Sequence, residues 1–153
     1  MGRSVPLVFG YVKFTNDRGE SILKPLIQVE LQKMHGKDIT AIATMALIDS
    51  GSDFNVFHAD LAAALGIDDM KKGEYIGEIG GVAQGEDGKK AKTIHGWRHP
   101  IGIKVKDRVR STDAIFSPDI ANYGFCILGQ VGFFDKFNAI SLSYKHGKII
   151  IKP

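Results

Sequence analysis

Apolar and polar residues alternate along much of the chain, in short runs that end at glycine, proline or small polar residues. Alternation with a period of two places every second side chain on the same face of an extended backbone, so each run predicts a half-buried strand. Residues 39–48 instead become continuously apolar toward their end, which is typical of a strand covered on both faces. The other runs that predict strands are residues 25–31, 101–109, 140–144 and 148–152.

Turn residues connect several of these runs. A glycine turn joins the last two runs into a closing hairpin. Residues 5–14 alternate loosely and lead into turn residues at 15–19, which predicts a first strand and hairpin. Residues 75–81 and 93–99 have the pattern of two extended arms on either side of a polar, glycine-rich loop. Further short strands are expected at residues 114–116 and 125–128.

Helical periodicity is nearly absent. Residues 60–65 are rich in alanine and leucine and are followed by Gly66, a residue that commonly ends a helix. Residues 133–137 favour one or two further helical turns. The sequence therefore predicts an all-β fold, a small closed or nearly closed β-barrel with one or two short helices. The length of 153 residues suits a single domain over 1–153, in which 1–24 form an N-terminal strand and hairpin segment.

The charge of the chain is mildly basic, with a formal net charge of +3 at pH 7. Basic residues gather at 89–92 and at 104–110, and the second group alternates with apolar residues as one solvated strand face would. Nucleic-acid binders have a stronger bias and stacking aromatic residues beside the basic ones. We therefore expect no nucleic-acid partner.

The cysteine content is one residue, Cys126, within an apolar run. A lone cysteine excludes an internal disulfide and a cysteine-based zinc site, and its surroundings predict a small buried core residue. We find no signal peptide and no apolar run near the about 20 residues that a membrane span requires. These features predict a cytoplasmic protein without membrane association.

Two histidines four positions apart, His95 and His99, have the spacing of metal ligands on a helix. Gly96 and the expected extended backbone place them on no helical face, so we expect surface residues and no metal or cofactor. The pattern Gly-x-Ser-x-Gly is absent, which disfavours Ser50 or Ser52 as the nucleophile of a serine hydrolase.

One acidic residue stands at the end of the continuously apolar strand. Asp49 follows Leu47 and Ile48 and precedes Ser50 and Gly51. A carboxylate beside such neighbours is costly to bury as an ion, so it must accept hydrogen bonds or share a proton. Gly51 allows a sharp turn that lets its own N–H approach the carboxylate, and Ser50 offers a hydroxyl close by. A simple exit from strand to turn would use the same Asp-Ser-Gly residues.

A second feature separates these two interpretations. The segment Ile127-Leu128-Gly129-Gln130 comes much later and precedes an aromatic turn at residues 133–137. Together with the Asp49 segment it resembles the retropepsin-like aspartic proteases, whose subunits have an apolar-apolar-Asp-Thr/Ser-Gly strand end and a later apolar-apolar-Gly before a C-terminal helix. Residues 134–151 are also similar to the ending of bacterial members, and the resemblance runs from around Pro25 to the end of the chain.

The resemblance implies a role for each matched residue of the Asp-Ser-Gly segment. Asp49 matches the catalytic aspartate. Ser50 stands where threonine is commoner and matches the hydroxyl that hydrogen-bonds across the family's dimer, beneath the two aspartates. Gly51 matches the glycine that faces the substrate.

The resemblance also implies a set of substrate-binding residues. Asp53 matches an acidic position that meets the substrate backbone in retroviral members, although Gln130 replaces the arginine that braces this position there. Gly80, Gly81 and Val82 fall in the region of the flap that closes over the substrate. This region is longer than in retroviral enzymes, so its tip is either Gly80-Gly81 or the turn at residues 85–88.

The chain has a single Asp-Thr/Ser-Gly segment. The family mechanism needs two carboxylates that share one proton, so the resemblance implies a homodimer in which each copy contributes one Asp49. The predicted function is that of an aspartic endopeptidase, acting on an extended peptide or protein substrate with apolar residues beside the cut. The alternative is the same fold without catalysis, used for dimerisation or peptide binding.

Overall fold

The computed structural model describes residues 4–79, 94–123 and 125–153. Strands make up most of this part of the chain: β1 (Leu7–Gly10), β2 (Val12–Thr15), β3 (Ser21–Lys24), β4 (Leu26–His35), β5 (Asp38–Ile48), β6 (Val56–His58), β7 (Glu74–Ile79), β8 (Ile94–Val105), β9 (Arg108–Ser117), β10 (Cys126–Leu128), β11 (Ala139–Ser143) and β12 (Lys148–Lys152). The helical segments are short: α1 (Ala59–Ala64) and the 3₁₀ turns η1 (Met70–Lys72), η3 (Pro118–Tyr123) and η4 (Phe134–Lys136).

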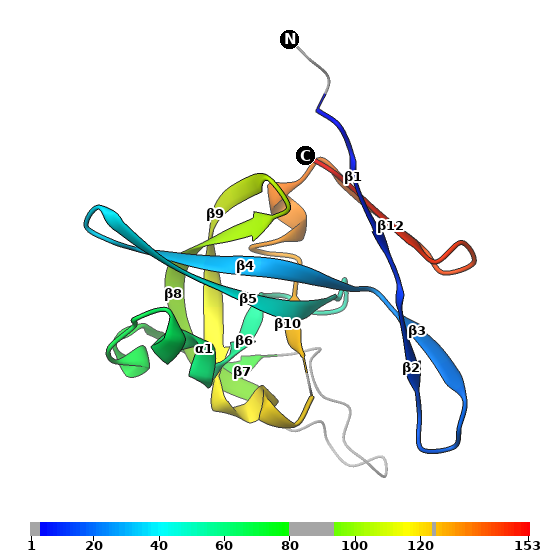
Figure 1. Ribbon diagram of the computed structural model, residues 1–153. Coiled ribbons are helices and arrows are strands. Elements are labelled where there is room, and N and C mark those ends of the chain that lie inside the picture. Colours follow the sequence, from blue (N-terminus) through cyan, green and yellow to red (C-terminus); the bar gives the residue numbers. More distant parts are fainter. Residues whose placement is uncertain (1–3, 80–93, 124) are drawn as a thin grey trace.

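The main sheet is 7-stranded and closes on itself (Figure 1). Its order is β4-β5-β10-β6-β9-β8-β7, and β4 also pairs with β8. This extra pairing joins the strands from β4 to β8 into a ring of hydrogen-bonded neighbours, with β7 added beside β8. The prediction of an all-β, closed or nearly closed structure with short helices is confirmed.

The two strands that lead to the Asp-Ser-Gly segment pair along their whole length. β4 and β5 run antiparallel from Leu26 opposite Leu47 to His35 opposite Asp38. Gly36, in the turn between them, has φ of 63°, a conformation that glycine adopts without steric cost. Both predicted strands are therefore present, and a tight turn at Gly36 connects them.

The prediction of one strand over residues 101–109 is wrong, because the chain turns within this range. β8 ends at Val105, β9 begins at Arg108, and these two residues face each other across the hairpin. Lys106 makes the turn with φ of 53°, a left-handed conformation that is uncommon for a residue with a side chain. No glycine marks the turn and the alternation continues on both arms. The short strand predicted at 114–116 is the end of β9.

Both ends of the described chain meet in a second sheet. This sheet is 3-stranded, in the order β1-β12-β11, so the predicted closing hairpin is confirmed and the N-terminal strand pairs along its edge. The strand predicted over residues 5–14 is interrupted at Tyr11. Beyond Tyr11, β2 and β3 form a separate 2-stranded ribbon that extends away from the ring (Figure 1).

Two basic residues of the β8–β9 hairpin hold the terminal sheet and η4 against the ring. Lys106 Nζ donates to the backbone carbonyl of Val8 in β1 at 2.8 Å. Arg110 Nε donates to the carbonyl of Lys136 at 3.1 Å, and its guanidinium lies 5.2 Å from the ring centroid of Phe137. Lys106 is exposed and Arg110 is half-buried, so these basic residues lie on a solvated face and also bind neighbouring backbone carbonyls.

The predicted helix is present as α1, shifted by one residue. His58 caps its start, because His58 Nδ1 accepts a hydrogen bond from the N–H of Asp60 at 3.0 Å. Gly66 follows the C-cap residue Leu65 with φ of 76°, as expected for a residue that ends a helix. The second predicted helical segment is the single 3₁₀ turn η4. No helix among the described residues is long and apolar enough to cross a membrane.

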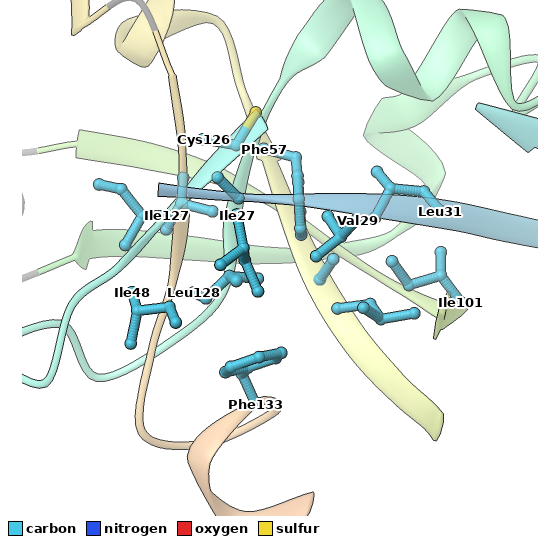
Figure 2. Packing of buried hydrophobic residues seen from close by; sticks show 14 of the residues in the cluster. Ile27, Val29, Leu31, Ile48, Phe57, Ile101, Cys126, Ile127, Leu128 and Phe133 are labelled. Carbon is cyan, nitrogen blue, oxygen red and sulfur yellow. The ribbon is translucent and has the colours of Figure 1, made fainter. Parts of the chain in front are cut away.

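Buried aliphatic and aromatic side chains fill the ring. Ile48 and Leu128 are partners in the parallel pairing of β5 and β10, and the ring of Phe133 points toward them (Figure 2). Leu128 is 0%, Phe133 1% and Ile48 3% exposed. The strand end from which Asp49 emerges is thus anchored in the core.

Cys126 belongs to this core, as predicted. It is 4% exposed. Burial raises the pKa of its thiol, and hydrogen bonds with the His58 backbone and the Thr44 hydroxyl only partly oppose this rise.

Phe133→Ala should lower the free energy of unfolding by about 3–5 kcal/mol, because it removes a buried ring and leaves a cavity. The measurement is denaturant unfolding at a fixed protein concentration. Val131, two positions earlier, is 57% exposed, so Val131→Ala is the matched control and should change the free energy by less than about 0.5 kcal/mol. Equal losses from the two variants would contradict the core assignment of Phe133.

Cys126 should react slowly with a thiol-specific disulfide reagent in the folded protein at pH 8, because the thiolate is the nucleophile and burial disfavours it. In urea the same thiol should react at the rate of an ordinary cysteine. Both rates are measured from the absorbance of the aromatic thiol that the reagent releases when it reacts with cysteine. Equal rates would mean that the thiol is accessible and ionised in the folded chain.

Candidate active site

Asp49 is the first residue beyond β5, where it leaves the core. The N–H of Ile48 donates to the carbonyl of Pro25 at 2.9 Å, and the N–H of Asp49 donates to the carbonyl of Leu128 at 3.0 Å. These bonds continue the sheet on both sides of the strand end. The backbone of Asp49 is therefore held as firmly as a strand residue, while its side chain is partly exposed.

The residues after Asp49 fold back on its carboxylate. Gly51 N–H donates to Asp49 Oδ1 at 2.9 Å, and Ser52 N–H donates to the Asp49 carbonyl at 3.2 Å. These two bonds fix the orientation of the carboxylate relative to the loop that follows it. A Cβ on residue 51 would lie 3.2 Å from Oδ1, a close approach that glycine accommodates best.

The segment after β10 holds the Asp49 loop from the other side. Gln130 N–H donates to the carbonyl of Ser52 at 2.9 Å, and Val131 N–H donates to the carbonyl of Asp53 at 2.8 Å. The side chain of Gln130 adds a third bond, from Nε2 to the carbonyl of Ser50 at 2.8 Å. The glutamine at this position thus braces the loop backbone.

Gly129 is required at the crossing of these two segments. A Cβ at this position would lie 2.4 Å from the carbonyl oxygen of Phe54, which is backbone and cannot swing aside. The glycine of the apolar-apolar-Gly segment is therefore explained by steric exclusion: a side chain there would collide with the backbone of Phe54.

The structure places the sequence-predicted residues in two groups. Ser50, Gly51 and Asp53 lie exposed beside Asp49. Among the described residues, the carboxylate of Asp53 forms no ion pair. The predicted substrate-binding residues Gly80, Gly81 and Val82 lie outside the described residues.

The two extended arms expected on either side of the polar, glycine-rich loop are β7 and β8, and they contact the Asp49 loop at their base. They pair antiparallel, with Glu74 opposite Arg98, and these two side chains form an ion pair at 3.5 Å. The guanidinium of Arg98 lies 5.1 Å from the ring centroid of Phe54. The base of the arms is therefore packed directly against the segment that follows Asp49.

The two histidines of β8 have separate partners. His95 Nδ1 lies 2.9 Å from a carboxylate oxygen of Asp119, and His99 Nε2 lies 2.6 Å from the carbonyl of Met70. His99 is 9% exposed, so its prediction as a surface residue is wrong, because the arm carries it against η1. The described residues contain no cluster of three His, Cys, Asp or Glu side chains suited to a metal ion.

Asn55 is a buried polar residue of the site that the sequence interpretation missed. It is 1% exposed, its Oδ1 accepts from Gly129 N–H at 3.0 Å, and its Nδ2 donates to the carbonyl of Asp113 at 3.3 Å. The sequence offered one sign of this role: Asn55 is polar, while the other residues of 54–57 are all apolar. A polar residue within an apolar run is a candidate for a buried, hydrogen-bonded side chain.

Comparison with known proteins supports the fold. No family model and no curated protein matches the chain. Among solved structures, a retropepsin-like aspartic protease from Rickettsia conorii aligns with 99% of this chain and 96% of its own, with a TM-score of 0.52 and 12% identity. EIAV protease in complex with the inhibitor HBY-793 aligns with 76% of this chain and 88% of its own, with a TM-score of 0.44 and 17% identity. The chain has the retropepsin-like fold that its motifs predicted.

Gly129→Ala should destabilise the protein by about 1–3 kcal/mol, because the added methyl group forces the two crossing segments apart. Denaturant unfolding measures the loss. The control is Gly102→Ala in β8, where the nearest atom to an added Cβ lies 3.5 Å away. A smaller loss at Gly129 than at Gly102 would mean that the crossing tolerates a side chain.

Proposed function

We propose that the protein is an aspartic endopeptidase whose active site forms when two copies of the chain each contribute one Asp49. The observation that carries this proposal is the setting of Asp49. Its backbone is held by Leu128, Oδ1 is held by the N–H of Gly51, and the side chain stays partly exposed at the end of a buried strand. The retropepsin-like fold, shared with a protein described as an aspartic protease, supports the same function.

Two copies are needed because one carboxylate cannot act as base and acid at the same moment. Two carboxylates about 3 Å apart cannot both ionise, so they share one proton and supply one group of each kind. Asp49 is the single Asp of the sequence that is followed by Ser or Thr and then Gly. A two-fold axis beside Asp49 would therefore complete the site with an identical residue.

In the proposed reaction the ionised Asp49 removes a proton from a water molecule, and the water oxygen attacks the carbonyl carbon of the peptide bond. The protonated Asp49 of the second copy donates its proton to the carbonyl oxygen, which gives a tetrahedral diol. When the diol collapses, the ionised Asp49 of the second copy takes a hydroxyl proton and the C–N bond breaks. The leaving nitrogen accepts the proton that the first Asp49 took from water, so both carboxyl groups return to their starting states. No covalent bond forms between enzyme and substrate.

An extended peptide is the substrate that suits this proposal. Ser50, Gly51 and Asp53 form an exposed rim beside Asp49. We assign Ser50 to the contact between copies beneath the two aspartates, and Gly51 and Asp53 to the substrate backbone, which would bind by β-augmentation. Gly80, Gly81 and Val82 are assigned to the flap above it.

Asp49→Ala and Asp49→Asn should both reduce cleavage of casein by about 10³-fold or more, because each removes the acid–base pair and leaves the fold in place. The assay runs from acid to neutral pH, and sedimentation measures whether each variant still forms the dimer. Asp60→Asn is the control, because Asp60 is exposed and lies on α1, away from the Asp49 loop.

Cleavage by Asp49→Ala at the wild-type rate would contradict the proposal. A wild-type dimer that cleaves nothing would instead favour the same fold acting as a peptide-binding or dimerisation module.

A further inference from the structure

One peptide group of the site is held at both of its ends. The Leu128 carbonyl accepts from the N–H of Asp49 at 3.0 Å, and the N–H of Gly129 in the same peptide group donates to Asn55 Oδ1 at 3.0 Å. A peptide group is planar and stiff, so its carbonyl and its N–H cannot reorient independently. Asn55 therefore controls the orientation of the carbonyl that holds the backbone of Asp49.

The side chain of Asn55 is itself fixed in place. Its Nδ2 donates to the carbonyl of Asp113 in β9 at 3.3 Å. A Cβ at Gly132 would lie 2.5 Å from Nδ2, so the neighbouring backbone closes around the amide. With 1% of its surface exposed, Asn55 is shielded from bulk water.

The two bonds of Asn55 require an amide with a defined orientation. Oδ1 faces a donor and Nδ2 faces an acceptor, and a neutral asparagine side chain supplies one of each. An apolar side chain of similar size would fill the same space but leave Gly129 N–H without its acceptor, and the Asp113 carbonyl with only the 3.5 Å bond from the Thr112 hydroxyl. That loss would let the Leu128–Gly129 peptide group tilt and would shift Asp49 with it.

We propose that Asn55 is a positioning residue for Asp49, acting through the Leu128–Gly129 peptide group. This inference rests on the proposed protease function for its effect on catalysis. A displacement of about 1 Å in a reacting group can reduce the rate about 10²-fold. Substitution of Asn55 should therefore lower kcat and change KM little, because Asn55 is buried below the exposed rim that is assigned to substrate.

The test compares three variants by casein cleavage and by sedimentation. Asn55→Leu removes both hydrogen bonds and should lower kcat by about 10²-fold while the dimer persists. Asn55→Asp keeps the shape, and its carboxyl retains both bonds only while it is protonated. Its kcat relative to wild type should be near one at acid pH and should fall as the pH rises and the introduced carboxyl ionises. Ile103→Val, in the core at 1% exposure on β8, is the control for a general loss of stability and should keep kcat.

A merely structural role for Asn55 predicts a different result. Asn55→Leu would then keep the wild-type kcat, or lose it only as much as an equally destabilised core variant, and the relative kcat of Asn55→Asp would not depend on pH. Either finding would overturn the proposal. If Asn55→Leu does not fold, the test rests on Asn55→Asp alone, through the change with pH of its kcat relative to wild type.

A second measurement separates this inference from the protease function. Hydrogen exchange of the Asp49 backbone N–H reports its bond to Leu128 whether or not the protein cleaves peptides. If wild type shows no Asp49-dependent cleavage, the proposed function fails, and the exchange rate then decides the role of Asn55. Faster exchange at Asp49 in the Asn55 variants than in Ile103→Val supports positioning, and equal exchange overturns it.

Discussion

The hydrogen bond from the Asp49 N–H to the Leu128 carbonyl, 3.0 Å long, is the contact on which the candidate site depends. A carboxylate cannot be left as an ion among apolar side chains, so it has to leave the core. Its backbone nevertheless has to be rigid if the carboxylate is to act at a defined place. The bond meets both requirements, because it extends the pairing of β5 with β10 by one residue beyond Ile48. The main chain is held as in a strand while the side chain reaches solvent.

The rest of the fold brings Leu128 to this position. β10 lies between β5 and β6 in the ring, paired parallel with the first and antiparallel with the second. A parallel partner for β5 must come from a distant part of the chain, because a short turn can join only antiparallel strands. Closure of the ring by β4 and β8, and the packing of Phe133 beneath the strand ends, supply the burial that offsets the entropy of that long connection.

In the proposed function, one chain positions its own Asp49, and the second copy supplies the carboxyl group that shares the proton. Position is supplied within one chain, through Gly51 on the carboxylate and Gln130 on the loop backbone. Shared protonation would be supplied only by the second copy, because a lone carboxylate has no partner that can hold its proton in turn. Under this proposal the chemistry depends on association and hence on protein concentration.

Local patterns in the sequence determined much of this protein. Period-two alternation located most strands, and Gly66 located the end of α1. The acidic residue at the end of an apolar strand made Asp49 a candidate, and the later apolar-apolar-Gly segment favoured it over a simple turn. Each of these signals depends on the conformation of neighbouring residues, which sequence spacing reports directly. The apolar-apolar-Gly segment at Gly129 was equally visible, although its steric cause, the Phe54 carbonyl, was not.

Only the tertiary structure decided which distant residues became partners. The turn at Lys106 carries no glycine, so alternation continued through it and concealed two strands as one. Arg110 of β9 holds η4, which lies far along the chain. His99 is buried against η1 because the pairing of β7 with β8 brings η1 beside it. The role of Asn55 also depends on the tertiary structure, because its two hydrogen-bond partners, Asp113 on β9 and Gly129 after β10, are far from it in the sequence. A side chain's local pattern indicates which face of a strand it occupies, but what that face meets is settled by the closed sheet.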